Sequence, residues 1–398
     1  MKVLMINVCC GTGSTGRICT DLADMLIEQG HECKIAYGRD EVPEKYRNIA
    51  VKIGTSFGVY CNALKARLLD NEGFNATKAT KKFIKWVKEY DPDIIHLHNL
   101  HGYYLNVEIL FDYLKTCEKK IVWTLHDCWA FTGHCSYFDC PHCDRWKTEC
   151  GQCVRLNDYP KALTDRSKRN FVLKKELFIG IPNLTIITPS KWLAELVKQS
   201  FLKGYPVHVI NNSIDLSVFK PTDSDFREKY GLIGKKIILG VASVWNARKG
   251  LNDFIKLANE IDDITKIVLV GITKKQRKLL PGNILAIERT NNVKELAEIY
   301  TASDVFFNPT YEDNYPTVNL EAQACGTPVV TYDTGGSGEC IVEKAGYMLN
   351  EKNIKSALPV LYKAIDLKRN NELICPNNVG QPNQFIAFSE YIKVYDIF

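Results

Sequence analysis

Two carboxylates lie eight positions apart around the start of a predicted helix in the second half of the chain. Asp313 precedes Pro316, which suits the first helical position, and Glu321 lies one turn further in, before the pattern ends at Gly326. A carboxylate beside a cleft can hold two hydroxyls of a ribose, and a helix start attracts phosphate or sugar oxygens. In isolation, an acidic helix start followed by a solvated glutamate would be the simpler interpretation.

A glycine-rich turn near the amino end follows the spacing Gly11-x-Gly13-x-x-Gly16, between an apolar run and an amphipathic stretch. Glycines at such a turn let the backbone approach a phosphate at a helix N-terminus. The next predicted strand ends at Tyr37 and Arg39, without the acid that would hold an adenine ribose. This absence weakens an NAD interpretation, leaves NADP open through Arg39, and leaves a plain strand-to-helix turn as the alternative.

Histidines follow two predicted parallel strands. His126 comes directly after an apolar strand and before Asp127, and His98 and Asn99 stand at the equivalent end of the preceding strand. Ligands of parallel sheets gather at the carboxyl ends of the strands. We therefore expect His126, His98 and Asn99 to contact a ligand, and the alternative is that they are structural groups whose hydrogen bonds are satisfied within the protein.

Five cysteines lie within nineteen residues and include two C-x-x-C pairs: Cys135, Cys140, Cys143, Cys150 and Cys153. Thiolates at such spacing can bind one tetrahedral zinc ion. The segment contains Pro141, Gly151 and charged groups, so we expect that apolar burial alone cannot order it. A structural zinc site is the favoured interpretation, reduced thiols and a redox pair are the alternatives, and His134 or His142 can replace a thiolate.

Predicted strands alternate with predicted helices through most of the chain, in two halves, which indicates parallel sheets with covered faces. The strands are expected at 2–8, 33–37, 94–98, 121–125, 184–188 and 208–210, and then at 236–241, 267–270, 304–308 and 328–332. The helices are expected at 17–29, 80–89, 107–115, 166–178, 250–261, 293–302 and 317–324.

The bulk composition limits the class of protein. With 398 residues and 45% hydrophobic content, the chain is long enough for two packed domains. A net charge of +5 is too small for its size to indicate nucleic-acid binding. No apolar run is long enough to span a membrane, and we expect a cytoplasmic protein with reduced cysteines.

A basic helical stretch at 166–178 combines five cationic side chains with apolar ones. It is a candidate for peripheral contact with anionic lipid at the inner face of the cell membrane. A surface helix that packs its apolar side inward is the slightly favoured alternative.

The segment 308–330 resembles the signature of retaining family 4 glycosyltransferases of the GT-B fold, in which two acids eight positions apart precede Ala-x-x-Cys-Gly-x-Pro-Val-Val. Further similarity covers nearly the whole chain, at 13–17, 96–102, 123–127, 188–193 and 209–215. The resemblance implies an α/β protein with two facing Rossmann-like domains, parallel sheets and a C-terminal helix crossing back to the N-terminal domain. The implied boundaries are 1–208 for acceptor binding, with a Cys-rich loop at 134–153, then 209–384 for the nucleotide-sugar, and 385–398 for the returning helix.

The same resemblance implies residue roles. Glu321 is expected to hold the donor ribose, and Asp313 to face the transferred sugar, although the family usually has Glu there and Glu312 is a substitute. Other donor contacts are expected at Asn314, Tyr315, Thr317, Gly13, Ser14 and Gly16, with His126 near the donor sugar. His98 and Asn99 are the candidates for contact with the acceptor.

A basic pair is expected on the diphosphate. Val244 stands where the family usually has Arg, so Arg248 and Lys249 are assigned to the diphosphate instead. The resemblance also selects Cys135, Cys143, Cys150 and Cys153 as the zinc ligands.

Together these features predict a retaining transferase that moves a sugar from a nucleotide-diphosphate donor to a glycan or lipid-linked acceptor, in cell-surface polysaccharide synthesis. The donor phosphate is expected to accept the proton of the acceptor. No catalytic divalent metal is expected, because no Asp-x-Asp motif stands in a suitable loop. A nucleotide-sugar epimerase or phosphorylase, an NADP oxidoreductase and a non-catalytic binding scaffold remain rivals.

Overall fold

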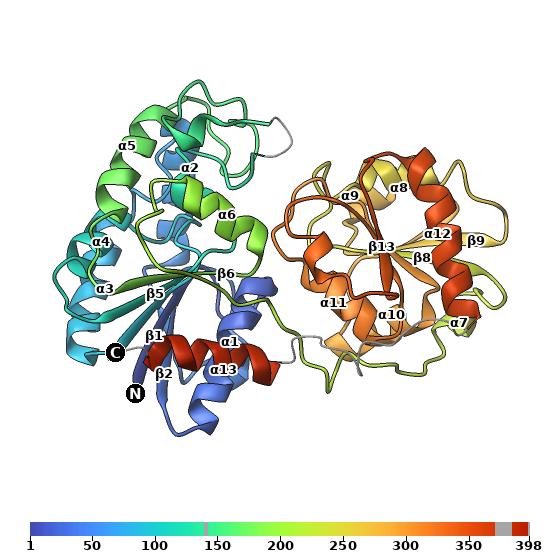
Figure 1. Ribbon diagram of the computed structural model, residues 1–398, viewed down its shortest axis with the longest axis horizontal. Coiled ribbons are helices and arrows are strands. Elements are labelled where there is room, and N and C mark those ends of the chain that lie inside the picture. Colours follow the sequence, from blue (N-terminus) through green and yellow to red (C-terminus); the bar gives the residue numbers. More distant parts are fainter. Residues whose placement is uncertain (139–141, 371–383, 397–398) are drawn as a thin grey trace. The chain divides into compact units, whose positions relative to one another are not determined.

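The computed structural model describes residues 1–138, 142–370 and 384–396. It divides into two compact units, each built on one parallel sheet (Figure 1). Unit 1 comprises Met1–Asn211 and the C-terminal segment from Ala387, and unit 2 comprises Asn212–Ile386.

Unit 1 contains a seven-stranded parallel sheet in the order β3-β2-β1-β4-β5-β6-β7. Its strands are β1 (Lys2–Asn7), β2 (Glu32–Tyr37), β3 (Ala50–Lys52), β4 (Ile94–Leu97), β5 (Lys120–Thr124), β6 (Leu184–Thr188) and β7 (Val207–Val209). The chain reverses its winding direction between β1 and β4, where open α/β sheets bind ligands at the carboxyl ends of the strands.

Helices cover both faces of this sheet, which explains why its strands are apolar on both sides. The helices of unit 1 are α1 (Gly13–Glu28), α2 (Ser56–Leu69), α3 (Thr77–Tyr90), α4 (Val107–Leu114), α5 (Ser167–Phe178), α6 (Lys191–Gln199) and α13 (Gln384–Asp396). Leu4 and Ile6 of β1 face a core that includes side chains of α3, α4 and α6, whereas Val3 and Met5 face side chains of α1 and α13.

The C-terminal helix α13 belongs to unit 1 from Ala387 onward. Phe388 and Tyr391 are buried against the sheet face that α1 also covers. Tyr395 donates or accepts a 2.7 Å hydrogen bond with Nδ1 of His96, whose Nε2 lies 2.8 Å from Thr124 Oγ1. Burial lowers the pKa of His96 to about 3, so this ring is neutral and serves as a structural link.

Unit 2 contains a six-stranded parallel sheet in the order β10-β9-β8-β11-β12-β13. Its strands are β8 (Lys236–Val241), β9 (Thr265–Val270), β10 (Ile284–Ile287), β11 (Val305–Asn308), β12 (Val329–Tyr332) and β13 (Gly346–Leu349). Its helices are α7 (Phe226–Lys229), α8 (Leu251–Leu257), α9 (Lys274–Arg277), α10 (Val293–Ala302), α11 (Thr317–Ala324) and α12 (Ile354–Arg369). Side chains of α8 and α12 pack on one sheet face, and those of α10 and α11 on the other.

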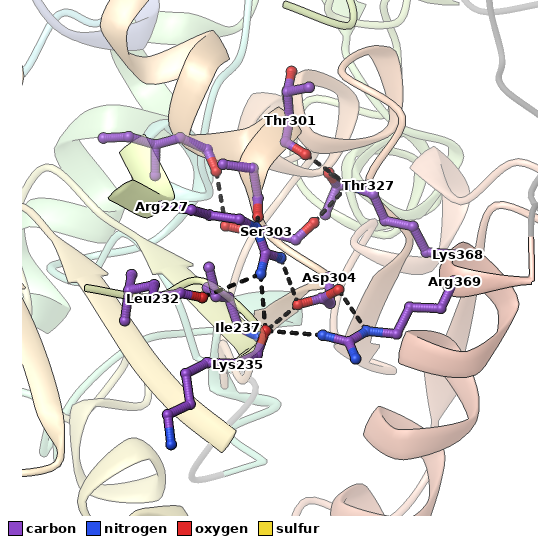
Figure 2. A network of polar contacts seen from close by, with 12 residues as sticks. Arg227, Leu232, Lys235, Ile237, Thr301, Ser303, Asp304, Thr327, Lys368 and Arg369 are labelled. Atoms are coloured by element: carbon purple, nitrogen blue, oxygen red, sulfur yellow. Dashed lines mark hydrogen bonds and ion pairs between the residues drawn. The ribbon is translucent and has the colours of Figure 1, made fainter. Parts of the chain in front are cut away.

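A charged network joins four elements at the amino ends of β8 and β11 (Figure 2). Asp304 accepts from Arg227 Nη2 at 2.8 Å and from Arg369 Nε at 2.9 Å, and its Oδ2 also accepts from the N–H of Ile237 at 2.7 Å. Lys368 donates to the carbonyl of Thr301 at 2.9 Å. The network therefore fixes α7 and α12 to the edge of the sheet opposite the predicted donor site.

Candidate active site

The predicted donor residues of unit 2 lie at the point where the strand order reverses, between β8 and β11. The loop after β8 carries Arg248 and Lys249, and the segment after β11 carries Asp313. Because parallel strands end at the same edge of a sheet, two segments separated by more than fifty residues meet there.

Direct contacts join these two segments. Lys249 Nζ forms an ion pair with Asp313 Oδ2, and both side chains are mostly buried. Arg248 Nη1 donates to the carbonyl of Glu312 at 2.7 Å, and the N–H of Tyr311 donates to the carbonyl of Arg248 at 2.8 Å. The two adjacent cations therefore differ in their contacts. Lys249 pairs with a carboxylate, whereas Arg248 donates to a backbone carbonyl and so stabilises the loop.

Gly250 allows the loop after β8 to lie close to the segment after β11. Its φ of +74° is a left-handed conformation that favours glycine, and a Cβ atom there would lie 2.3 Å from the carbonyl oxygen of Pro309. Any larger residue would push the basic loop away from Asp313.

The residues after Asp313 lead into α11. Pro316 stands at the N-cap and offers no side-chain acceptor to the N–H groups of the first turn, which favours an anion or sugar oxygen there. Asn314 and Tyr315 are buried, and the carbonyl of Tyr315 accepts from Asn212 Nδ2 at 3.0 Å. Thr317 begins the helix.

Glu321 lies in the middle of α11 and is only 2% exposed. Its Oε2 accepts a hydrogen bond from the hydroxyl of Tyr300, on α10, at 3.1 Å. No sequence pattern pointed to Tyr300 as a partner of Glu321, because contact between two helices depends on their packing. This hydrogen bond restrains the rotamer of the Glu321 carboxylate.

In unit 1, the carboxyl ends of β4 and β5 bring two predicted histidines together. His98 Nδ1 lies 3.0 Å from His126 Nε2, and the rings are stacked with centroids 5.3 Å apart. Burial lowers the pKa of His126 to about 4 and that of His98 well below its usual value. Both rings are therefore neutral at pH 7, and one donates to the other. Asn99 follows, and its N–H donates to Asn7 Oδ1 at 3.2 Å.

A second polar chain stands beside this pair and was not assigned a role from the sequence. His101 Nε2 lies 2.9 Å from Asp127 Oδ2, and its Nδ1 lies 3.0 Å from the hydroxyl of Tyr159. Burial would raise the pKa of Asp127, but the contacts with His101 outweigh it and hold that pKa below its usual value. The ionised Asp127 thus orients His101. The position of Asp127 directly after His126, at the end of a strand, was the one feature of the sequence that could have indicated a role for Asp127.

The glycine turn of unit 1 adopts backbone conformations that favour glycine. Gly11 and Gly13 have φ values of +75° and +65°, and a Cβ on Gly16 would lie 3.2 Å from the backbone nitrogen of Gly11. α1 begins at Gly13, earlier than the expected residue 17, so Ser14 lies in its first turn.

The structure does not support the predicted zinc site. Among residues 1–138, 142–370 and 384–396, no group of three or more His, Cys, Asp and Glu side chains has an arrangement that could hold a metal ion. Of the predicted ligands, Cys135 and Cys153 share a side-chain hydrogen bond, and Cys150 accepts from the N–H of Gly133 at 3.3 Å. Cys143 packs partly buried at the edge of the core, and Cys140 lies outside the described residues.

The expectation that apolar burial cannot order this loop is wrong. Phe131, Phe138 and Trp146 are buried in the core of unit 1, and the rings of Phe138 and Trp146 stack with centroids 4.8 Å apart. Counting charges and turn residues understated the burial available from three large aromatic side chains.

Lys174 of α5 also supports this loop. Its ammonium donates to the carbonyls of Trp129 and Thr132 at 2.8 and 3.1 Å and lies 3.4 Å from the centroid of the Trp129 ring. Burial lowers its pKa to about 7.

We expect Lys174→Met to lower the free energy of unfolding of unit 1 by about 1–3 kcal/mol, because two buried carbonyl oxygens lose their donor. Urea denaturation followed by tryptophan fluorescence measures this, with the exposed neighbour Lys175→Met as control. Equal midpoints for the two variants would mean that Lys174 does not support the loop.

Comparisons with known proteins agree with this architecture. A family model described as Glycosyltransferase Family 4 matches residues 15–218, and one described as Glycosyl transferases group 1 matches residues 222–374. A protein of Escherichia coli strain K12 that carries the name of a colanic acid biosynthesis glycosyl transferase, WcaC, is 25% identical over 369 residues, covering 89% of this chain and 88% of that protein. An N,N'-diacetylbacillosaminyl-diphospho-undecaprenol alpha-1,3-N-acetylgalactosaminyltransferase of Campylobacter jejuni is 26% identical over 218 residues, covering 51% and 57%.

Solved structures share the fold at low sequence identity. Anabaena Alr3699/HepE in complex with UDP matches with a TM-score of 0.68 at 13% identity, over 100% of both chains. The catalytic domain of Arabidopsis thaliana starch synthase IV, bound to ADP and acarbose, matches with a TM-score of 0.65 at 14% identity, over 99% of this chain and 98% of that one. The fold is GT-B, and since the family model at 15–218 spans just over half of the 398 residues, the chain belongs to the family 4 glycosyltransferases.

Proposed function

We propose that this glycosyltransferase moves a sugar from a nucleoside-diphosphate donor to a glycan or lipid-linked acceptor, with retention of the anomeric configuration, in the synthesis of a cell-surface polysaccharide. The donor binds unit 2 and the acceptor binds unit 1. The observation that carries the proposal is the meeting of Lys249 and Asp313 at the point of unit 2 where the strand order reverses.

The chemistry of these groups supports donor binding. Lys249 and Arg248 supply positive charge, and the start of α11 supplies N–H groups, where negative charge develops on a departing diphosphate. When the diphosphate arrives, Lys249 can leave Asp313 for it, and Asp313 is then available to a sugar hydroxyl. The buried Glu321 is assigned to the two ribose hydroxyls.

The neutral histidines of unit 1 suit contact with uncharged sugar hydroxyls. A neutral imidazole can accept or donate one hydrogen bond at each nitrogen, which matches hydroxyl groups. His126 is assigned to the donor sugar, and His98 and Asn99 to the acceptor side. The donor phosphate is assigned as the group that accepts the proton of the acceptor.

A solved structure and a curated relative support the proposed classes of donor and acceptor. The Anabaena structure holds UDP, and a related crystal structure of the same protein holds UDP-glucose. The name of the Campylobacter jejuni relative gives a diphospho-undecaprenol acceptor. By analogy, a uridine or adenosine diphosphate sugar and a lipid-linked saccharide are the first compounds to test.

The first experiment incubates the protein with a panel of nucleotide sugars, measures thermal shifts, and then determines the anomeric configuration of any product by NMR. An inverted product would contradict retention while leaving transfer intact. Release of free sugar phosphate without an acceptor would favour a phosphorylase instead.

We expect Glu321→Ala to weaken donor binding by about 10- to 100-fold, because each hydrogen bond to a charged group contributes about 1.5–3 kcal/mol. Calorimetry of nucleotide-sugar binding measures this, with the exposed acid of the same unit in Glu343→Ala as control. Glu321→Gln keeps the side-chain shape and should fall between them. Unchanged affinity in folded Glu321→Ala would remove Glu321 from the donor site.

A further inference from the structure

Helix α2 is apolar on two faces but is hardly buried. Its inner side packs Val59 at the edge of the core and buries Ala66, and Asn62 Nδ2 donates to the carbonyl of Tyr103 at 3.0 Å. Ala66 is the only residue of α2 whose side chain is buried. Large apolar side chains on a helix face normally pack against a neighbouring element, but those on the outer face of α2 are exposed in the part of the chain that the structure describes.

The outer face carries one continuous row of large side chains, which we call the α2 stripe: Phe57, Tyr60, Leu64 and Leu68. Their spacing places them on the same side of the helix. Phe57 is 77% exposed and Tyr60 is 70% exposed, and the two leucines are exposed as well. An exposed row of this kind marks an interaction surface more often than a chance distribution of single apolar residues.

A neighbouring segment extends the stripe. The N–H of Leu163 donates to the carbonyl of Arg67 at 2.8 Å, and Thr164 Oγ1 donates to the carbonyl of Leu68 at 2.9 Å. These bonds hold Leu163, which is 65% exposed, beside the carboxyl end of α2. The apolar surface therefore continues beyond the helix on a fixed backbone.

Only positive charge accompanies the stripe on α2. The helix contains no Asp or Glu, and Lys65 and Arg67 lie about a quarter turn to either side of the stripe. Lys52 adds a third cation at the amino end, where its Nζ lies 3.2 Å from Ser56 Oγ.

The first acids after the helix face inward. Asp70 is 2% exposed and accepts from the N–H of Arg166 at 2.7 Å and pairs with His134. Glu72 is buried and accepts from the N–H groups of Gly102 and Tyr103. Neither carboxylate offsets the cations beside the stripe.

The other candidate surface, α5, is excluded by its packing. Phe171 and Phe178 are buried, and Lys174 is fully buried with two carbonyl partners. The apolar side of α5 therefore packs inward, which was the slightly favoured interpretation of that stretch.

We propose that the α2 stripe docks unit 1 on a bilayer that contains anionic lipid, with the apolar side chains at the headgroup and acyl-chain boundary and the three cations among the headgroups. An apolar helix face flanked by cations on both sides matches that boundary. A second copy of the chain fits less well, because a symmetric contact would bring each row of cations against its own kind.

The test is flotation of the full chain with vesicles of phosphatidylglycerol mixed with phosphatidylcholine, and with vesicles of phosphatidylcholine alone. We expect binding to the mixed vesicles, and loss of about 100-fold in partitioning for the triple variant Phe57→Ser, Tyr60→Ser, Leu64→Ser. A matched triple variant of exposed apolar residues in unit 2, Ile233→Ser, Ile264→Ser, Leu279→Ser, should bind as the unchanged protein does.

Charge is tested separately. Lys52→Gln and Lys65→Gln should each weaken binding to the mixed vesicles by about fivefold and leave binding to neutral vesicles unchanged. Circular dichroism and urea denaturation establish that each variant is folded. Equal flotation of the two triple variants would overturn the proposal, as would a dimer in sedimentation velocity that only the α2 variant dissociates. Because no donor or acceptor is added, failure of vesicle binding is distinct from failure of the transferase proposal.

Discussion

Replacing Lys249 with alanine is expected to lower the turnover of donor by about 10²- to 10³-fold, the usual effect of removing one group that stabilises developing negative charge. The ammonium is held at the edge of the sheet by Asp313, on a loop fixed by Gly250. Its charge is therefore positioned before the substrate arrives. The measurement is the kcat of nucleotide release with a saturating acceptor.

Matched variants separate the contributions of this cluster. Lys275→Ala removes an exposed lysine of the same unit and should leave kcat unchanged. Arg248→Ala should lower kcat as well, and also stability, because its guanidinium braces the carbonyl of Glu312. If neither Lys249→Ala nor Arg248→Ala changes kcat in folded protein, the diphosphate lies elsewhere and Val244 marks a real departure from the family.

Asp304→Asn is expected to destabilise unit 2 by about 3 kcal/mol. The carboxylate is 7% exposed and binds two guanidinium groups, and removal of one partner from a buried ion network costs about 3–5 kcal/mol. The lower value applies because Arg227 and Arg369 remain partly exposed and can be rehydrated. Urea denaturation of the full chain measures the loss, and Asp263→Asn provides an exposed acid of the same unit as control.

The difference in the free energy of unfolding between the unchanged protein and Asp304→Asn is expected to decrease as the pH falls. Burial would raise the pKa of Asp304, but the hydrogen bond from Arg369 and the charge of Arg227 outweigh it and hold the pKa below its usual value. Because the folded-state pKa lies below the unfolded-state value, the stabilisation is present above about pH 4 and is lost as the pH falls through the folded-state pKa. A difference between the two proteins that stays constant down to pH 2 would contradict an ionic role for Asp304.

Local sequence predicted the alternation of strands and helices because burial on both faces leaves short apolar runs that are visible in the chain. β1, β4, β5 and β11 are found where they are expected, within a residue or so. α2 had no such signal, since its inner and outer faces are both apolar and a helix pattern requires a polar side. The burial or exposure of its outer face is decided by the neighbours it packs against.

For the candidate site, the order of residues along the chain predicted which residue types stand after which strand. His126 follows a strand of a parallel sheet, and the carboxyl ends of such strands carry ligands, so that inference needs only the order of elements. Arg248, Lys249 and Asp313 were assigned through the resemblance of their segments to family 4 motifs. The resemblance to family 4 glycosyltransferases likewise rested on short motifs that can be recognised in the sequence without a structure.

The hydrogen-bond and ion-pair partners of the buried polar residues could not be predicted in the same way, because they depend on how the elements pack. The contact of Glu321 with Tyr300, of His98 with His126, and of Asp304 with Arg369 joins side chains from different elements. The Cys-rich loop shows the same limit, because spacing indicated ligands but could not show that Trp146 and Phe138 pack into the core. Spacing along a chain fixes which groups can come together, whereas the packing of helices on sheets fixes which of them do.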